Sequence, residues 1–256
     1  MAEAVEPAVQ AEHEAVQVTS EVAPAVVARG IAVRGEEGPA YGPLDVEIPG
    51  EGLSILNGRG GSGRTALALT ITGRMKVSEG ELEVLGETQP KKIRDMVAIA
   101  GVESIDALDR NVRVHEILTE HRAWSKLWIT WTKPADEQYR NELCSEVFGK
   151  RDMPPLDVYV SQLSSLDRIL LRICLALRPA NGADIKMLVM DDFEQVREQE
   201  DRIILLDVLT RIAKTMPVVL NAVNPIEGVA HHQIELFTDA AHLQPKNTGR
   251  HHKDEQ

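Results

Sequence analysis

The feature that most constrains this chain is a glycine-rich segment at residues 58–65, with the sequence GRGGSGRT. The apolar run before it (LSIL, 53–56) is typical of a buried strand, and the run after it (ALALTI, 66–71) is typical of a helix. Strand, glycine loop and helix in this order predict a phosphate-binding loop. Glycines let consecutive backbone N–H groups face phosphate oxygens, and the helix N-terminus adds its positive dipole end. A ligand-free glycine turn is the alternative, and the flanking strand and helix favour phosphate binding.

The side chains of this loop indicate how a nucleotide with its magnesium ion would be held. Thr65 stands where a hydroxyl can ligate Mg²⁺, and Arg64 stands where the motif normally has lysine. Arginine keeps the positive charge, but its guanidinium is planar, forked and bulkier than an ammonium. The residues expected to bind the nucleotide are Gly58, Arg59, Gly60, Gly61, Ser62, Gly63, Arg64, Thr65 and Ala66.

A second candidate site element is an apolar run that ends in two acids. Residues 185–190 (IKMLVM) are typical of a buried strand, and Asp191 and Asp192 follow directly. In phosphate-loop enzymes the first such acid holds Mg²⁺ or its water, and the second orients the attacking water. We therefore expect Thr65 and Asp191 to bind the metal. A strand that merely ends in a polar turn is the alternative, which the glycine loop upstream makes the weaker one.

Composition narrows the class of protein further. The 256 residues are 43% hydrophobic, enough for one large or two small domains with a core. A net charge of −12 without any block of Lys and Arg argues against a nucleic acid partner. Cys144 and Cys174 lie in separate helix-like runs, which argues against a disulfide framework and fits a reducing cytoplasm. The acidic N-terminus argues against a signal peptide, and no run approaches the roughly 20 apolar residues of a membrane span.

All three tryptophans fall in one helix-like region. Ile117, His121, Trp124, Trp128 and Trp131 recur at helical spacing, so they form a single stripe. One interpretation is the core of a small helical subdomain, and the other is a docking surface, where tryptophan is enriched. The size of these side chains favours the core, because large aromatic groups usually bury themselves.

With these motifs in place, the order of elements over residues 25–243 resembles the nucleotide-binding subunit of an ABC transporter. The resemblance implies an α/β P-loop NTPase fold with a parallel sheet core, an antiparallel β subdomain and an inserted helical subdomain at about 105–180. The nucleotide-binding domain would then cover residues 25–245, between an acidic tail at 1–24 and a polar tail at 246–256. The motifs GGSGRTAL and Asp-Asp resemble in particular an actinobacterial group found beside phage-infection-protein-like permeases.

The same resemblance implies cofactors, partners and a location. It implies ATP with Mg²⁺, an integral-membrane permease, and pairing of two cassette domains as a homodimer or a heterodimer. The protein would be cytoplasmic and would sit peripherally at the inner face of the cell membrane. Its substrate would be selected by the permease rather than by this chain.

Several positions depart from the family pattern. Where the family has a signature of the type LSGGQ, this chain reads LSSLD and keeps only Ser164 of the polar residues. The last acid, usually Glu, falls on Asp192, and the switch histidine falls on Asn224. The glutamine of the loop after the strand at 96–100 falls near Val102, and the adenine-stacking aromatic near Arg34.

These departures affect hydrolysis more than binding. Asp192 and Asn224 remain the candidate catalytic residues, but Asp192 is one methylene short and Asn224 cannot carry a proton at neutral pH. The resemblance therefore predicts an ATP-binding transporter subunit that hydrolyses ATP slowly or only with its permease. The alternatives are a catalytically inactive nucleotide-sensing module that regulates a membrane partner, and a soluble cassette protein that acts away from membranes.

Overall fold

The computed structural model describes residues 22–35, 38–125, 132–226 and 232–236, so most of the two predicted tails lies outside the described residues. The strands are β1 (Val26–Gly35), β2 (Gly38–Ile48), β3 (Leu53–Asn57), β4 (Glu79–Val84), β5 (Val97–Ala100), β6 (Met187–Met190), β7 (Val218–Ala222) and β8 (His232–Glu235). The helices are α1 (Arg64–Ile71), α2 (Pro90–Met96), α3 (Glu103–Asp106), α4 (Val114–Trp124), α5 (Glu137–Phe148), α6 (Ser165–Leu177) and α7 (Gln199–Ile212), with short 3-10 turns η1 (Val160–Gln162) and η2 (Phe193–Gln195).

A five-stranded parallel sheet forms the centre of the described chain, in the order β5-β6-β7-β3-β8. Every residue of β3, β5, β6 and β7 is buried, because both faces of the sheet are covered. The side chains alternate between the two faces, so Ile55 joins the core on one side and Leu56 the core on the other. The strands predicted from apolar runs are confirmed, and β8 lies at the edge of the sheet.

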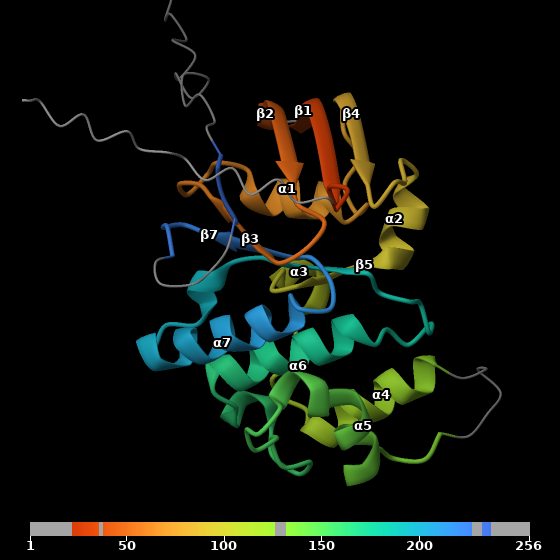
Figure 1. The fold of residues 1–256 in the computed structure, drawn as a ribbon. Helices are drawn as coiled ribbons and strands as arrows, with labels where there is room; N and C mark the ends of the chain where they lie inside the picture. Colours follow the sequence, from red (N-terminus) through yellow and green to blue (C-terminus); the bar gives the residue numbers. More distant parts are fainter. Residues whose placement is uncertain (1–21, 36–37, 126–131, 227–231, 237–256) are drawn as a thin grey trace, which may run out of the picture.

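On one face of the parallel sheet, α1 separates it from a three-stranded antiparallel sheet of order β2-β1-β4 (Figure 1). Leu67 and Ile71 of α1 share an apolar core with Ile31 of β1 and Val46 of β2. This arrangement places the antiparallel sheet over the helix that follows the glycine loop. The predicted combination of a parallel core with an antiparallel β subdomain is confirmed.

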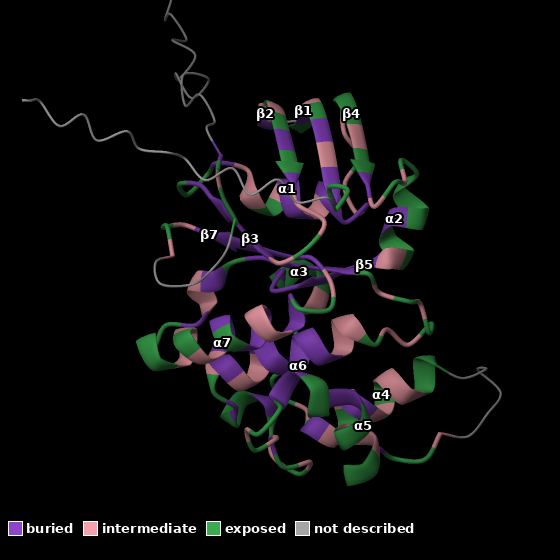
Figure 2. Cartoon of the chain, viewed as in Figure 1, coloured by how far each residue is buried: buried purple, intermediate pink, exposed green. Residues whose placement is uncertain are grey.

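The other face is covered by α6 and α7, with α4 and α5 packed further out (Figure 1). Helices α3 to α6 all lie between β5 and β6 in the chain. In α6, Leu166 and Leu170 are fully buried. Much of this helix is coloured as buried in Figure 2. The helices thus follow the order that the resemblance implies.

The tryptophan stripe is not buried at Trp124. Trp124, the last residue of α4, is 74% exposed, and the buried residues of this helix are Val114 and Leu118. The interpretation of Trp124 as a core residue is therefore wrong. Val114 and Leu118, one helical turn apart, mark the side of α4 that faces the core, and Trp124 does not share their burial. Trp128 and Trp131 lie outside the described residues.

Candidate functional site

The glycine loop connects the end of β3 to the start of α1. Its first N–H, from Gly58, donates to the carbonyl of Ala222 at the end of β7 (3.3 Å). Gly63 precedes α1 with φ 78°, and no side chain caps this helix start. A Cβ on Gly63 would lie 2.5 Å from the carbonyl oxygen of Ala40 in β2, so only glycine fits there. The first N–H groups of α1 are therefore left without a side-chain acceptor of the protein.

Two side chains fold back over the loop. A Cβ on Gly58 would lie 2.5 Å from Ser62 Oγ and 3.3 Å from Arg64 Cγ, so these side chains fill the space above Gly58. Arg64 Nη1 and Ser62 Oγ are both buried and have no hydrogen-bond partner. A buried guanidinium N–H without an acceptor is costly, and an anion in the loop would satisfy it.

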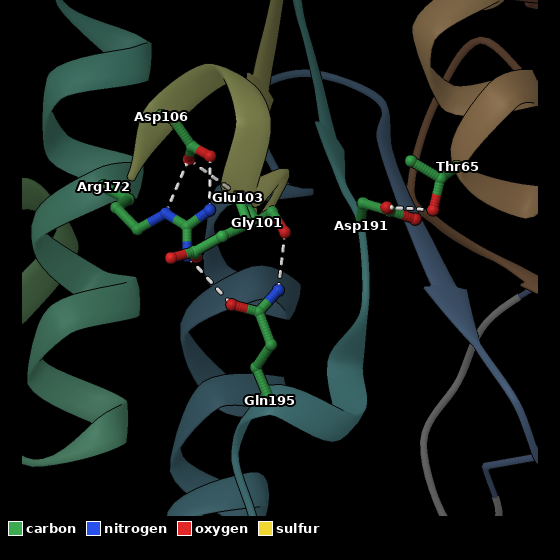
Figure 3. Close-up of polar contacts among 7 residues, drawn as sticks. All are labelled: Thr65, Gly101, Glu103, Asp106, Arg172, Asp191 and Gln195. Atoms are coloured by element: carbon green, nitrogen blue, oxygen red, sulfur yellow. Dashed lines mark hydrogen bonds and ion pairs between the residues drawn. The ribbon is translucent and has the colours of Figure 1, made fainter. Parts of the chain in front are cut away.

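The predicted metal residues meet at the C-terminal edge of the parallel sheet. Thr65 Oγ1 donates to Asp191 Oδ2 over 2.6 Å, as Figure 3 shows. Asn221 Nδ2 donates to Asp191 Oδ1 (2.7 Å) and to the carbonyl of Arg64 (3.0 Å). A hydroxyl and a carboxylate side by side are the hard oxygen ligands that Mg²⁺ prefers, so these residues fit that ion. Asn221 was missed in the sequence, although a lone Asn inside the apolar run VVLNAV was the available signal.

Two further carboxylates follow Asp191. Asp192 has a left-handed backbone (φ 56°), which is uncommon for a residue other than glycine. Partial burial raises the pKa of its carboxyl group, and the charges of Glu194 and Asp191 add to this, while Arg64 and a hydrogen bond from Gln195 lower it. These effects place Asp192 in electrostatic reach of the loop arginine.

Glu194 is a residue that the sequence patterns did not single out. Its Oε1 accepts the N–H of Val223 (2.7 Å), and its Oε2 is buried without a partner. Asn224, the second candidate catalytic residue, comes directly after Val223 and is exposed. The segment after β6 is thereby tied to the segment after β7.

Unpartnered polar atoms concentrate at this edge of the sheet. Nine buried side-chain nitrogen and oxygen atoms in the described part of the chain have no hydrogen-bond partner. Six of the nine belong to residues of the loop or of the strand ends around it, namely Asn57, Ser62, Arg64, Glu194 and Asn221. Native proteins rarely leave buried polar groups unpaired, and exceptions call for a ligand, ion or water. A polar ligand bound at this edge of the sheet would supply the missing hydrogen-bond partners.

A buried arginine joins this edge to the helical layer. Arg172 of α6, only 5% exposed, donates through Nε to Asp106 Oδ2 (2.8 Å) and through Nη2 to Oδ1 of the same carboxylate. Its Nη1 donates to Gln195 Oε1 (2.9 Å), and Gln195 Nε2 donates to the carbonyl of Gly101 (Figure 3). Sequence patterns did not single out Arg172, although a lone charge in the apolar run ILLRICLAL was the available signal.

The position that matches the family signature is the start of α6. Ser164 is the N-cap of α6, and its Oγ accepts the N–H of Asp167 (2.9 Å). Leu166 is fully buried, and Arg151 pairs with the Asp167 carboxylate (3.0 Å). This helix start is thus capped by its own side chain and carries an acid. No hydrogen bond joins Ser164 to the glycine loop anywhere in the described ranges.

Two other matched positions are also occupied differently. Val102, where the family has a glutamine nearby, is 3% exposed and packs in the core with α1. Arg34, near the adenine-stacking position, forms an exposed ion pair with Glu79 (3.0 Å). Neither side chain offers the chemistry of the family residue.

A cavity of about 310 Å³ lies beside the arginine network, between α4, α6 and the segment after β5. Its wall is mainly apolar, and Asp106 and Arg172 are its charged residues near the network. The apolar lining residues are Ile99, Ala107, Leu108, Ile117, Trp124, Leu175 and Ala176.

Together these features define the class. A buried parallel sheet, a glycine loop leading into a helix, and a Thr–Asp pair at the C-terminal edge are the features of a P-loop nucleotide-binding fold. The antiparallel sheet over α1 and the helices between β5 and β6 give it the form of the ABC ATPases.

Comparison with known proteins agrees with this fold. The chain is similar to the molybdenum import ATP-binding protein ModC of Thiobacillus denitrificans, at 46% identity over 44 residues, covering 17% of this chain and 12% of that protein. It is also similar to the cytochrome c biogenesis ATP-binding export protein CcmA of Xanthomonas campestris pv. campestris, at 32% identity over 65 residues, covering 25% and 30% of the two chains. The matched segments therefore span less than a third of either relative.

Among solved structures, the chain is similar to cbiO1 from Clostridium perfringens, which is part of the ABC transporter complex cbiONQ. The match covers 79% of this chain and 79% of cbiO1, with a TM-score of 0.62 and 14% identity. An identity this low shows the fold alone. No protein-family profile matches the chain. Among the described helices, none is long and apolar enough to cross a membrane.

Proposed function

We propose that this protein is an ATP-binding subunit of an ABC-type membrane transporter. The observation that carries the proposal is the set of unpartnered polar atoms around the glycine loop, above all the buried Arg64 Nη1. A polyphosphate is the ligand that would satisfy this guanidinium together with the uncapped N–H groups of α1. The short similarities to ModC and CcmA support the same class.

The roles of the loop residues follow from their chemistry. Residues 58–66 would hold the phosphates with backbone N–H groups, and Arg64 would neutralise part of their charge. Thr65 and Asp191 would hold Mg²⁺, which spreads the negative charge of the phosphates when it is bound. Asn221 keeps the Asp191 carboxylate oriented through its 2.7 Å hydrogen bond.

We further propose that hydrolysis is slow or depends on the permease complex. A second cassette would normally cover the terminal phosphate with the helix start at its signature. In this chain that helix start is closed by the Ser164 cap and carries Asp167, which would repel phosphate. The same observation favours the alternative function, a nucleotide-binding regulatory module without turnover.

The partner would be an integral-membrane permease, which would place the subunit peripherally at the inner face of the cell membrane. The apolar cavity next to the exposed Trp124 is the surface that we propose for this contact. The closed helix start of α6 supports pairing with a different cassette more than with a second copy. The motifs GGSGRTAL and Asp-Asp support membership of the actinobacterial group beside phage-infection-protein-like permeases.

Calorimetric titration of the purified full chain with ATP, with and without Mg²⁺, tests the binding proposal. We expect binding that weakens without Mg²⁺, and a Thr65→Val variant that loses this magnesium dependence. Thr88→Val is the matched control, since Thr88 is exposed and lies outside the site. No binding by the wild type, or unchanged magnesium dependence in Thr65→Val, would overturn the proposal. ATP turnover of wild type and Asp192→Asn, alone and with the permease, separates the two functions, because an inert wild type that still binds ATP supports the regulatory module.

A further inference from the structure

Resting on the proposed function, we propose that Glu194 is a second carboxylate of the hydrolytic site, which positions the attacking water and accepts its proton. In this step the water oxygen bonds to the γ-phosphorus while the bond from that phosphorus to the β,γ-bridging oxygen breaks. ADP leaves with the electron pair of the broken bond, and the water proton passes to Glu194 Oε2. The position three residues after Asp191 is thus given a role that Asp192 is too short to fill alone.

The first observation is that one oxygen of Glu194 is fixed. Oε1 accepts the N–H of Val223 over 2.7 Å, so the carboxylate is held between the segments that follow β6 and β7. The same peptide group offers its carbonyl, that of Ala222, to the N–H of Gly58 at 3.3 Å. One peptide unit therefore links Glu194 to the first residue of the glycine loop. Hydrogen bonds in such a chain polarise and strengthen one another.

The second observation is that the other oxygen is unused. Glu194 Oε2 is buried and has no hydrogen-bond partner. A carboxylate oxygen shielded from water without a donor is unfavourable, whereas a donor such as a bound water would satisfy it. This oxygen is one of the six unpartnered atoms around the loop, at the edge of the sheet where we propose that the nucleotide binds.

The third observation is that Glu194 and Asp192 belong to the same short turn after β6. Asp192 is the N-cap of η2, and Glu194 lies inside this turn. Two carboxylates in different environments can take different roles in one reaction. One is held in place and accepts a proton, and the other stays close to the positive charges of the site. Glu194 is the anchored one of the two, because its Oε1 accepts the N–H of Val223.

A purely structural role for Glu194 is the competing explanation, and glutamine distinguishes the two. Glu194→Gln keeps the side-chain volume and an acceptor for the Val223 N–H, and it removes the ability to take a proton. We expect turnover of Mg-ATP by the full chain to fall by about 10²-fold, while affinity for Mg-ADP stays within about threefold of wild type. Affinity for Mg-ADP with aluminium fluoride, a mimic of the transferring phosphoryl group, should fall with turnover. The matched control is Glu198→Gln, at an exposed position in the same segment.

Three results would overturn the inference. The first is a Glu194→Gln turnover within about threefold of wild type. The second is an equal loss of Mg-ADP affinity and turnover, which would mean that Glu194 only braces Gly58. The third is a wild type that binds Mg-ATP without turning it over either alone or with its permease, which would remove the hydrolytic role and leave the binding proposal standing. A wild type that binds no nucleotide would instead refute the proposed function itself.

Discussion

Replacing Arg64 with methionine should change stability and nucleotide binding in opposite directions. Methionine keeps an unbranched stem over Gly58, where Arg64 Cγ lies 3.3 Å from the place a Cβ would take, and it removes the unpartnered Nη1. A hydrogen bond between charged groups contributes about 1.5–3 kcal/mol, so losing one phosphate contact should weaken Mg-ATP binding about 10- to 150-fold. Without nucleotide, the variant no longer buries an unsatisfied donor. We expect its free energy of unfolding to rise by about 1 kcal/mol, or about 2–4 °C in Tm.

Calorimetric titration measures the affinity, and thermal unfolding of the nucleotide-free protein measures the stability. Arg197→Met, at an exposed position after η2, is the control for a change of charge alone. Arg64→Lys restores a cation and should bind nucleotide within about threefold of wild type without fast turnover. A methionine variant that binds Mg-ATP as tightly as wild type, or that loses stability without nucleotide, would refute the idea that Arg64 awaits an anion.

Two further predictions concern the groups around the site. Arg172→Met leaves the Asp106 carboxylate without its buried partner and should lower the free energy of unfolding by about 3–5 kcal/mol. The double variant Arg172→Met/Asp106→Asn should recover part of this loss. Denaturant unfolding measures both variants, and an equal loss in the two would contradict the pairing. The Asp192 carboxyl group has a raised pKa in the folded chain, so its ionised form opposes folding and stability falls as pH rises through the unfolded and then the folded pKa. Asp192→Asn should therefore raise Tm at neutral pH and not below the unfolded pKa of about 3.9, and a gain at acid pH alone would show the opposite sign.

Local patterns predicted the strands, the glycine loop and the helices that flank them. Apolar runs such as LSIL and IKMLVM identify buried strands because both faces of the parallel sheet are covered. The closeness of Thr65 and Asp191 agreed with the motif, since the carboxyl ends of parallel strands meet at one edge. These features depend on short stretches of sequence and on a rule that holds for many sheets.

The residues that were missed depend on which strands become neighbours. Asn221 reaches Asp191 only because β7 lies between β6 and β3, an order that hydrophobic periodicity does not encode. Glu194 reaches Val223 for the same reason. Arg172 is buried because the segment after β5 supplies Asp106 and covers it, a contact that the sequence of α6 alone does not encode. For Trp124 the prediction of burial was wrong, because helical spacing identifies residues that share one side of a helix but not which side faces the core.

The network around Arg172 has a mechanical consequence for the cavity beside it. Asp106 and Arg172 form part of the cavity wall, and Arg172 is bonded to Gln195, whose side chain also holds the carbonyl of Gly101. The backbone N–H of Gln195 in turn donates to the backbone carbonyl of Asp192 over 3.1 Å. Only one residue, Gln195, therefore separates the wall of the cavity from the backbone of Asp192. A ligand or partner side chain that enters the cavity and displaces Arg172 must either break the hydrogen bond to Gln195 or move Gln195 as well. A change in the cavity is therefore coupled to the segment that follows Asp191.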